Sequence, residues 1–189
     1  MGHRAQRDPD AGSVIETPGQ TIGPFFGFAL PYRGDAHLVP PGNQDAVQFT
    51  GRVLDGNGSP VPDALIEIWQ PDADGHIVAR AGSLLRDGFT FTGWGRAATD
   101  GTGRFTFATI RPGGEVPFIA VTVFARGLLH RLFTRAYLPG HEPDQLLASL
   151  PEHRRRTLLA VDDGPNLHFD IRLQGAEETV FLSFTGQHD

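Results

Sequence analysis

The chain has 189 residues, of which 39% are hydrophobic and 20% charged, which is enough for one domain with a hydrophobic core and too few for two domains of ordinary size. Its net charge of −6 is spread along the chain, and the basic residues form only one run, at Arg154–Arg156, which argues against nucleic acid as a partner. Cysteine is absent, which excludes disulfides, thiolate metal ligands and a cysteine nucleophile.

The first residues, MGHRAQRDPDAG, are polar and contain no apolar segment of the kind found in signal peptides. No apolar window approaches the roughly 20 residues that span a bilayer. We therefore expect a cytoplasmic protein. We also expect a flexible N-terminus at 1–15, followed by a single β-sandwich domain at 16–189.

The 24 glycines and 15 prolines predict short strands joined by turns. The first strand alternates from Val47 to Leu54 and ends at the turn sequence Asp-Gly-Asn-Gly, 55–58. The second, 64–70, carries bulky side chains on both faces, which is typical of a strand inside a sheet. A third alternates through Phe105, Phe107 and Thr109, and the apolar stretch 118–127 is the next.

The stretch 166–175 alternates between inward apolar side chains and outward polar ones, and ETVFLSF, 178–184, is the last predicted strand. The spacing of these elements favours a mainly β fold, a two-layer antiparallel β-sandwich with an extended N-terminal segment. The exception lies near 143–160, where the spacing of the leucines predicts one or two short helices interrupted by Pro151.

The common catalytic motifs are missing from the sequence, including the G-x-S-x-G elbow and the Walker loop. Eight histidines are present, but no two have the spacing i, i+2 or i, i+4 that would place them side by side on a strand or a helix. The residues alone therefore do not favour a metal site.

Two stretches remain unusual. ETPGQTIGPFFGF, 16–28, is apolar and nearly uncharged, so it either packs across the sandwich or forms a wall against a ligand or partner. Arg126 ends an apolar strand, where a guanidinium needs acceptors. Its partner is an internal carboxylate, with Asp170 or Glu67 as candidates, or else a bound carboxylate ligand or a neighbouring chain.

These stretches, in this order, resemble the α chains of the intradiol ring-cleaving dioxygenases that are built from α and β chains. The matching segments run from about residue 16 to the end of the chain and include ETPGQTIGPFF, GRVLDGNGSPVPDALIEIWQPDADG, GWGRAATDGTGRFTFATIRPG, VTVFARGLLHRLFTRAYLPG and FDIRLQGAEETVFLSF. The resemblance implies an intradiol-dioxygenase β-sandwich and a role beside a catalytic β chain.

In the β chains of this family, two tyrosines and two histidines hold a non-haem ferric ion. The corresponding positions here are Ile77, the segment 114–116, Phe118 and Ala120, and none of them supplies a ligand. No tyrosine occurs between Tyr32 and Tyr137, so the conclusion does not depend on the alignment. The resemblance therefore implies that iron belongs to the β chain and that this chain alone is inactive and holds no metal.

The family's α chains line part of the β chain's cleft through residues that match Thr21, Gly23, Pro24 and Arg126, which are the expected substrate-binding residues. The implied substrates are a catechol acid, protocatechuate, and O2. The chain's own pocket position, with Phe118, Ala120 and Val121, is expected to be dry core.

Two alternatives stay open. One is a non-enzymatic β-sandwich carrier or binding module that forms no complex. The other is a self-sufficient enzyme with a different metal site, using His130 and Tyr137.

Overall fold

The computed structural model describes residues 23, 26–78, 86–87 and 89–184, without the side chain of Phe28. The expected flexible segment at 1–15 lies outside these residues. The described elements, in chain order, are α1 (Phe26–Ala29), β1 (Val47–Leu54), β2 (Leu65–Trp69), β3 (Trp94–Ala98), β4 (Arg104–Thr109), β5 (Phe118–Phe124), β6 (Leu132–Tyr137), α2 (Gln145–Ser149), α3 (Glu152–Arg155), the 3-10 turn η1 (Arg156–Leu158), β7 (Val161–Asp162), β8 (Asn166–His168) and β9 (Ile171–Arg172). The longest of these helices, α2, has five residues, so none of them has the length that crossing a membrane requires.

Four strands form an antiparallel sheet in the order β3-β2-β5-β6. β2 lies inside this sheet, as its bulky side chains on both faces predicted. Along β5, Ile119, Val121 and Val123 point into the interior, whereas Phe118 and Ala120 lie half-buried on the opposite side. We call that opposite side the outer face of the four-stranded sheet.

The second sheet has the order β4-β1-β8-β7, with β9 also paired to β1. β4 is antiparallel to β1, but β8 and β9 run parallel to it. The stretch predicted as one strand at 166–175 is therefore interrupted between β8 and β9, where Asp170 accepts a hydrogen bond from the Arg52 backbone N–H at 2.8 Å. The predicted two-layer β-sandwich is confirmed, and these parallel pairings are a feature that alternation alone does not reveal.

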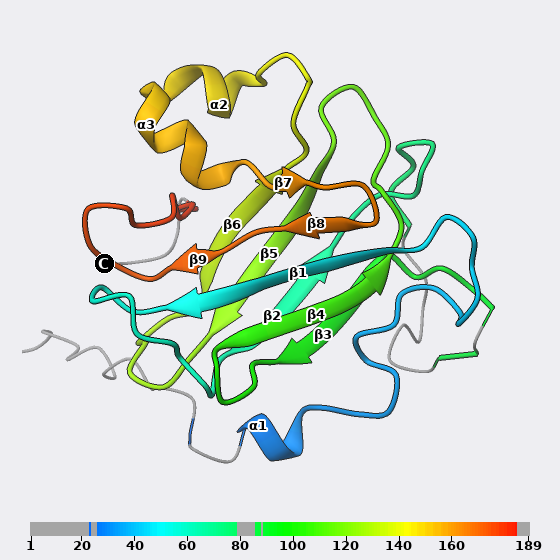
Figure 1. The fold of residues 1–189 in the computed structure, drawn as a ribbon, viewed down its shortest axis with the longest axis horizontal. Helices are drawn as coiled ribbons and strands as arrows, with labels where there is room; N and C mark the ends of the chain where they lie inside the picture. Colours follow the sequence, from blue (N-terminus) through cyan, green and yellow to red (C-terminus); the bar gives the residue numbers. More distant parts are fainter. Residues whose placement is uncertain (1–22, 24–25, 79–85, 88, 185–189) are drawn as a thin grey trace, which may run out of the picture.

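The main hydrophobic core fills the space between the two sheets, which overlie one another in Figure 1. On the side of β1, neighbouring phenyl rings lie with their centroids 5.8 to 6.4 Å apart. These rings belong to Phe49, Phe105, Phe107 and Phe169. The facing sheet contributes aliphatic side chains from β2 and β5, so that the core holds the residues whose alternation the sequence displays.

The predicted helices near 143–160 are confirmed as α2, α3 and η1, which gather at one end of the sandwich in Figure 1. Asp144 caps α2, since its Oδ1 accepts from the Leu147 backbone N–H at 2.9 Å. Pro151 separates α2 from α3. Leu147 and Leu158 then pack with Tyr137 and Val180 in a second, smaller core.

A three-residue polar network ties α2 to the edge strand β6. The hydroxyl of Tyr137 donates to Asp144 Oδ2 at 2.8 Å, and Arg135 donates to the Tyr137 hydroxyl at 2.9 Å and to Asp144 Oδ2 at 3.2 Å. Tyr137 is almost fully buried, so its hydroxyl needs these partners. One carboxylate thus serves both the start of the helix and the sheet.

The segment 178–184 does not form the predicted last strand. It runs extended past the edge of the sheet and is held by single hydrogen bonds, such as Thr134 Oγ1 to the Val180 carbonyl and Leu182 N–H to the Phe133 carbonyl, both 2.8 Å. Alternation predicts an extended chain, but it does not say whether a neighbouring strand offers a continuous ladder.

Replacing Gly51 by alanine is expected to destabilise the fold by about 2 kcal/mol or more. A Cβ at Gly51 would lie 1.8 Å from the Phe169 carbonyl oxygen, which is backbone and cannot swing aside. Gly101→Ala, in an exposed turn with nothing within 4 Å of the added methyl group, is the matched control. Equal urea midpoints for the two variants would contradict this prediction.

The network also predicts a pH dependence of stability. Burial raises the pKa of Tyr137 from 10.0 to about 12, an effect to which the Asp144 carboxylate adds and which Arg135 opposes. Because the folded protein holds this proton more tightly than the unfolded chain, the resulting stability is complete below pH 10 and is lost as the pH rises towards 12.

Urea unfolding at pH values from neutral to alkaline measures this loss. Tyr137→Phe is expected to be less stable than the parent at neutral pH, where two hydrogen bonds are lost, and to show a shallower decline above pH 10. Tyr32, whose pKa burial also raises, remains in the variant and contributes its own decline in both proteins. Parallel pH profiles for the two proteins would overturn the assignment to Tyr137.

Candidate functional site

Two of the four expected substrate-binding residues, Gly23 and Arg126, are described by the structure; Thr21 and Pro24 lie outside the described residues. Gly23 is exposed and stands directly before α1, where its carbonyl accepts from the Phe26 N–H. Arg126 stands in the turn after β5. Among the described residues, no hydrogen bond joins Gly23 to Arg126. Both α1 and the connection from β5 to β6 lie toward the lower edge of Figure 1.

Arg126 forms an ion pair with Asp63, through its Nε–H and the carboxylate Oδ2. The two internal candidates named from the sequence, Asp170 and Glu67, are therefore wrong. Glu67 pairs instead with Arg96, whose Nε donates to it at 2.9 Å. Asp170 lies on the other sheet, where it meets His168 Nε2 at 2.9 Å.

Asp63 became the partner because of strand register. Leu65 on β2 lies opposite Phe124 on β5, and Asp63 and Arg126 lie two residues beyond this pair, in the turns that adjoin the two strands. These residues are 63 positions apart in the chain. The sequence displays the two strands but not their register, so no sequence signal identified Asp63.

The positions that the resemblance aligns with iron ligands offer no donor set. Ile77 is 79% exposed in the loop after β2. Phe118 and Ala120 lie half-buried on the outer face, whereas Val121 belongs to the main core. The expectation that all three form dry core is therefore wrong for Phe118 and Ala120, since alternation along β5 places them on the side away from Val121.

The positively charged side chain of Arg135 lies beside Phe118 and Ala120. Arg135 is the register partner of Ala120 across β5 and β6, and its guanidinium carbon lies 4.3 Å from the centroid of the Phe118 ring. A guanidinium keeps its charge at all ordinary pH values. The outer face therefore presents an aromatic ring, a methyl group and a fixed positive charge where the family resemblance would place two histidine ligands.

Arg126 and this ligand-free position lie at opposite ends of β5. Phe118 begins the strand, and Arg126 follows its last residue, Phe124, by two positions. At the rise of an extended chain, this separation is about 25 Å. Arg126 therefore cannot act on a molecule held beside Phe118 in the same chain.

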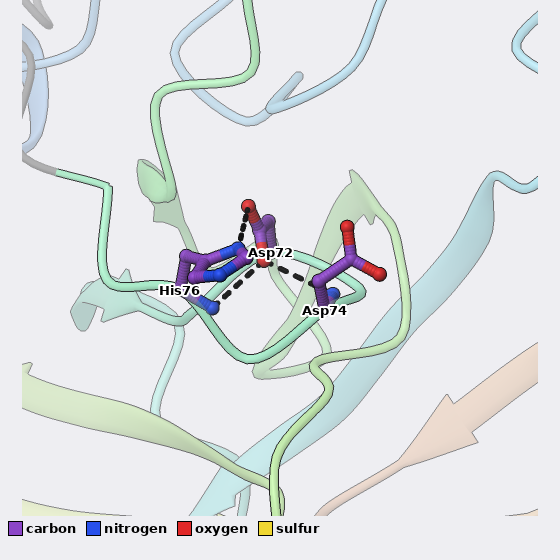
Figure 2. A group of neighbouring side chains, drawn as sticks. All are labelled: Asp72, Asp74 and His76. Carbon is purple, nitrogen blue, oxygen red and sulfur yellow. Dashed lines mark hydrogen bonds and ion pairs between the residues drawn. The ribbon is translucent and has the colours of Figure 1, made fainter.

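One group of side chains has the composition of a small metal site. Asp72, Asp74 and His76 bring their possible ligand atoms within 4.8 Å of one another, in the loop after β2. Figure 2 shows that the hydrogen bonds of this group run mainly to backbone nitrogens: Asp72 Oδ1 accepts from the N–H of Asp74 at 3.0 Å and of His76 at 2.8 Å. The hydrogen bond from the His76 backbone N–H to the Asp72 carboxylate is the main reason why the pKa of Asp72 is lowered.

This group is a turn rather than a metal centre. Asp72 uses its side chain and its backbone carbonyl to close the loop, with Gly75 and Gly113 N–H groups donating to that carbonyl at 3.1 and 2.8 Å. His76 projects into solvent with 77% of its side chain exposed. The spacing of the histidines alone did not reveal this group, because two of its three members are carboxylates.

The alternative metal site at His130 and Tyr137 is not formed. His130 is exposed before β6 and Tyr137 is the last residue of that strand, so the two are about 20 Å apart. The Tyr137 hydroxyl is already bound to Asp144 and Arg135.

Comparison with known proteins agrees with this geometry. The family model described as "Dioxygenase" matches residues 23–158. The protocatechuate 3,4-dioxygenase alpha chain of Burkholderia cepacia is 35% identical over 193 residues, which cover 90% of this chain and 98% of the relative. The beta chain of the same enzyme in Burkholderia cepacia is 34% identical over 160 residues, covering 71% of this chain and 67% of the relative.

A solved structure supports the same assignment. The dioxygenase domain of a dioxygenase carbohydrate-binding protein fusion from Streptomyces sp. SirexAA-E superposes with a TM-score of 0.55 and 30% identity, covering 85% of this chain and 99% of that domain. Sequence, fold and the matched segments lead to one conclusion: the chain belongs to the dioxygenase family, among the intradiol ring-cleaving enzymes.

Proposed function

We propose that this chain is the α subunit of a protocatechuate 3,4-dioxygenase, which shapes the substrate cleft of an iron-bearing β chain. The complex cleaves protocatechuate with O2 to 3-carboxy-cis,cis-muconate. The observation that carries this proposal is the outer face of β5 and β6, where Phe118 and Ala120 stand at two positions that the resemblance assigns to metal ligands and Arg135 lies beside them. The near-complete coverage of an alpha-chain relative supports it.

The residues at the aligned positions of β5 do not fit a ferric ion. Ferric iron prefers hard anionic oxygen donors, and neither a phenyl ring nor a methyl group supplies one. The Arg135 guanidinium adds electrostatic repulsion, because a positive charge a few ångströms from a trivalent cation is unfavourable even when partly screened. We therefore assign the iron to the β chain.

A β-chain partner also accounts for exposed apolar side chains. Trp69 at the end of β2, Ile77 in the following loop and Phe89 in the loop before β3 are 44%, 79% and 88% exposed. Large apolar groups that remain exposed on an isolated chain are typical of surfaces that another chain covers. A β-chain relative with the same family fold is the partner that the comparisons suggest. The absence of cysteine suits a complex in the reducing cytoplasm.

Arg126 is the residue through which this chain assists the reaction. Its distance of about 25 Å from Phe118 supports a role toward a neighbouring chain rather than toward its own fold. The guanidinium is 60% exposed and favours the carboxylate of a catechol acid bound in the β-chain cleft, where Thr21, Gly23 and Pro24 complete the wall. A charge-assisted hydrogen bond of this kind contributes about 1.5–3 kcal/mol.

The separately purified chain is expected to hold no stoichiometric iron and to leave protocatechuate uncleaved, because its outer face has no anionic donors. Metal analysis and an absorption spectrum test this, with the α/β complex measured in parallel and a circular dichroism spectrum to show that the lone chain is folded. A burgundy ferric-tyrosinate colour in the folded lone chain would contradict the proposal. A stable, inactive monomer that forms no complex with a β chain would favour the carrier instead.

Arg126→Ala in the co-expressed complex is expected to raise KM for protocatechuate about tenfold or more, because a charge-assisted hydrogen bond is lost. KM of Arg126→Lys is expected to lie between that of the parent and that of Arg126→Ala, since lysine keeps the positive charge but lacks the planar, forked donors of arginine. Iron content should not change. The matched control is Arg104→Ala, an exposed arginine at the start of β4 on the other sheet. If both alanine variants leave KM unchanged, Arg126 does not contact the substrate.

A further inference from the structure

Asp63 and Arg126 lie in the turns before β2 and after β5 and form an ion pair. The last register pair, Leu65 with Phe124, lies two residues inward from each of them. The pair therefore lies at the end of the four-stranded sheet that is remote from Phe118. Both residues lie in turns next to the strand ends, and these turns bring the carboxylate to the guanidinium.

The ion pair uses one particular edge of the guanidinium. Asp63 Oδ2 accepts from Nε, which leaves the two terminal nitrogens outside this bond. Because the five N–H donors of arginine lie in one rigid plane, a partner fixed at Nε sets both the plane and the direction of the terminal donors. A second carboxylate can then approach those terminal donors in a bidentate manner.

Stability does not explain the pair. Arg126 is 60% exposed and Asp63 is 31% exposed, and exposed ion pairs of this kind contribute little to folding. The matched pair Glu152 with Arg156 shows the same chemistry on the helical surface. Asp63 differs from Glu152 in its partner: Asp63 pairs with Arg126, the residue that we propose binds the substrate carboxylate.

We infer that Asp63 is a positioning residue for Arg126, which holds the guanidinium with its terminal donors directed at the carboxylate of a catechol acid. This inference rests on the proposed function. The pair is close to neutral, so it selects a carboxylate-bearing catechol by the geometry of two hydrogen bonds more than by net charge. Asp63 thereby contributes to the distinction between protocatechuate and unsubstituted catechol.

The test is steady-state kinetics on the co-expressed α/β complex with protocatechuate and with catechol. Asp63→Ala is expected to raise KM for protocatechuate roughly three- to tenfold, the effect of ordering one long side chain, while kcat stays close to that of the parent. Asp63→Asn should keep most of the affinity, because its amide oxygen still accepts from Nε. KM for catechol should not change. Glu152→Ala is the control for loss of an exposed acid that pairs with an arginine.

The double variant Asp63→Ala/Arg126→Ala separates the two proposals. Positioning requires that Asp63→Ala has no further effect once Arg126 is gone. If Arg126→Ala raises KM but Asp63→Ala leaves it unchanged or lowers it, Asp63 only competes with the substrate and the inference is overturned while the role of Arg126 stands. If Arg126→Ala has no effect, the proposed contact itself fails. Equal effects of Asp63→Ala on catechol and protocatechuate would also refute positioning.

Discussion

The register of β5 against β2 and β6 is the constraint on which the arrangement of this protein depends. A strand shows its side chains alternately to two faces, so a slip of one residue would exchange the interior set for the outer set. In the observed register, Ile119, Val121 and Val123 enter the core. The same register sets Arg135 beside Ala120 at one end and directs Arg126 toward Asp63 at the other.

Much of the fold follows from the sequence because its physical cause is local. Alternation and turn residues are written in the chain, so β1, β2, β4 and β5 could be predicted, as could helices interrupted by Pro151. The parallel pairing of β8 and β9 with β1 could not, since it depends on contacts between segments more than one hundred residues apart. The segment 178–184 has the alternation of a strand, but the edge of β6 offers it only isolated hydrogen bonds.

The candidate site divides in the same way. The sequence shows directly that no tyrosine or histidine stands at Ile77, Phe118 or Ala120, the positions that the resemblance aligns with iron ligands. Which acid meets Arg126 depends on strand register, and two acids that stood on plausible outward positions, Glu67 and Asp170, already have other partners. In the sequence, nothing distinguishes Arg135 from the other basic residues. The Arg135 guanidinium lies over the Phe118 ring because β5 and β6 pair in this register and because Asp144 accepts a hydrogen bond from the same guanidinium.

The guanidinium of Arg135 ties the outer face of the four-stranded sheet to the start of α2. Histidines introduced at Phe118 and Ala120 would stand next to a fixed cation, and removing that cation would take a partner from the carboxylate that caps α2. A metal centre could therefore not be engineered on this face without rebuilding the junction between β6 and α2.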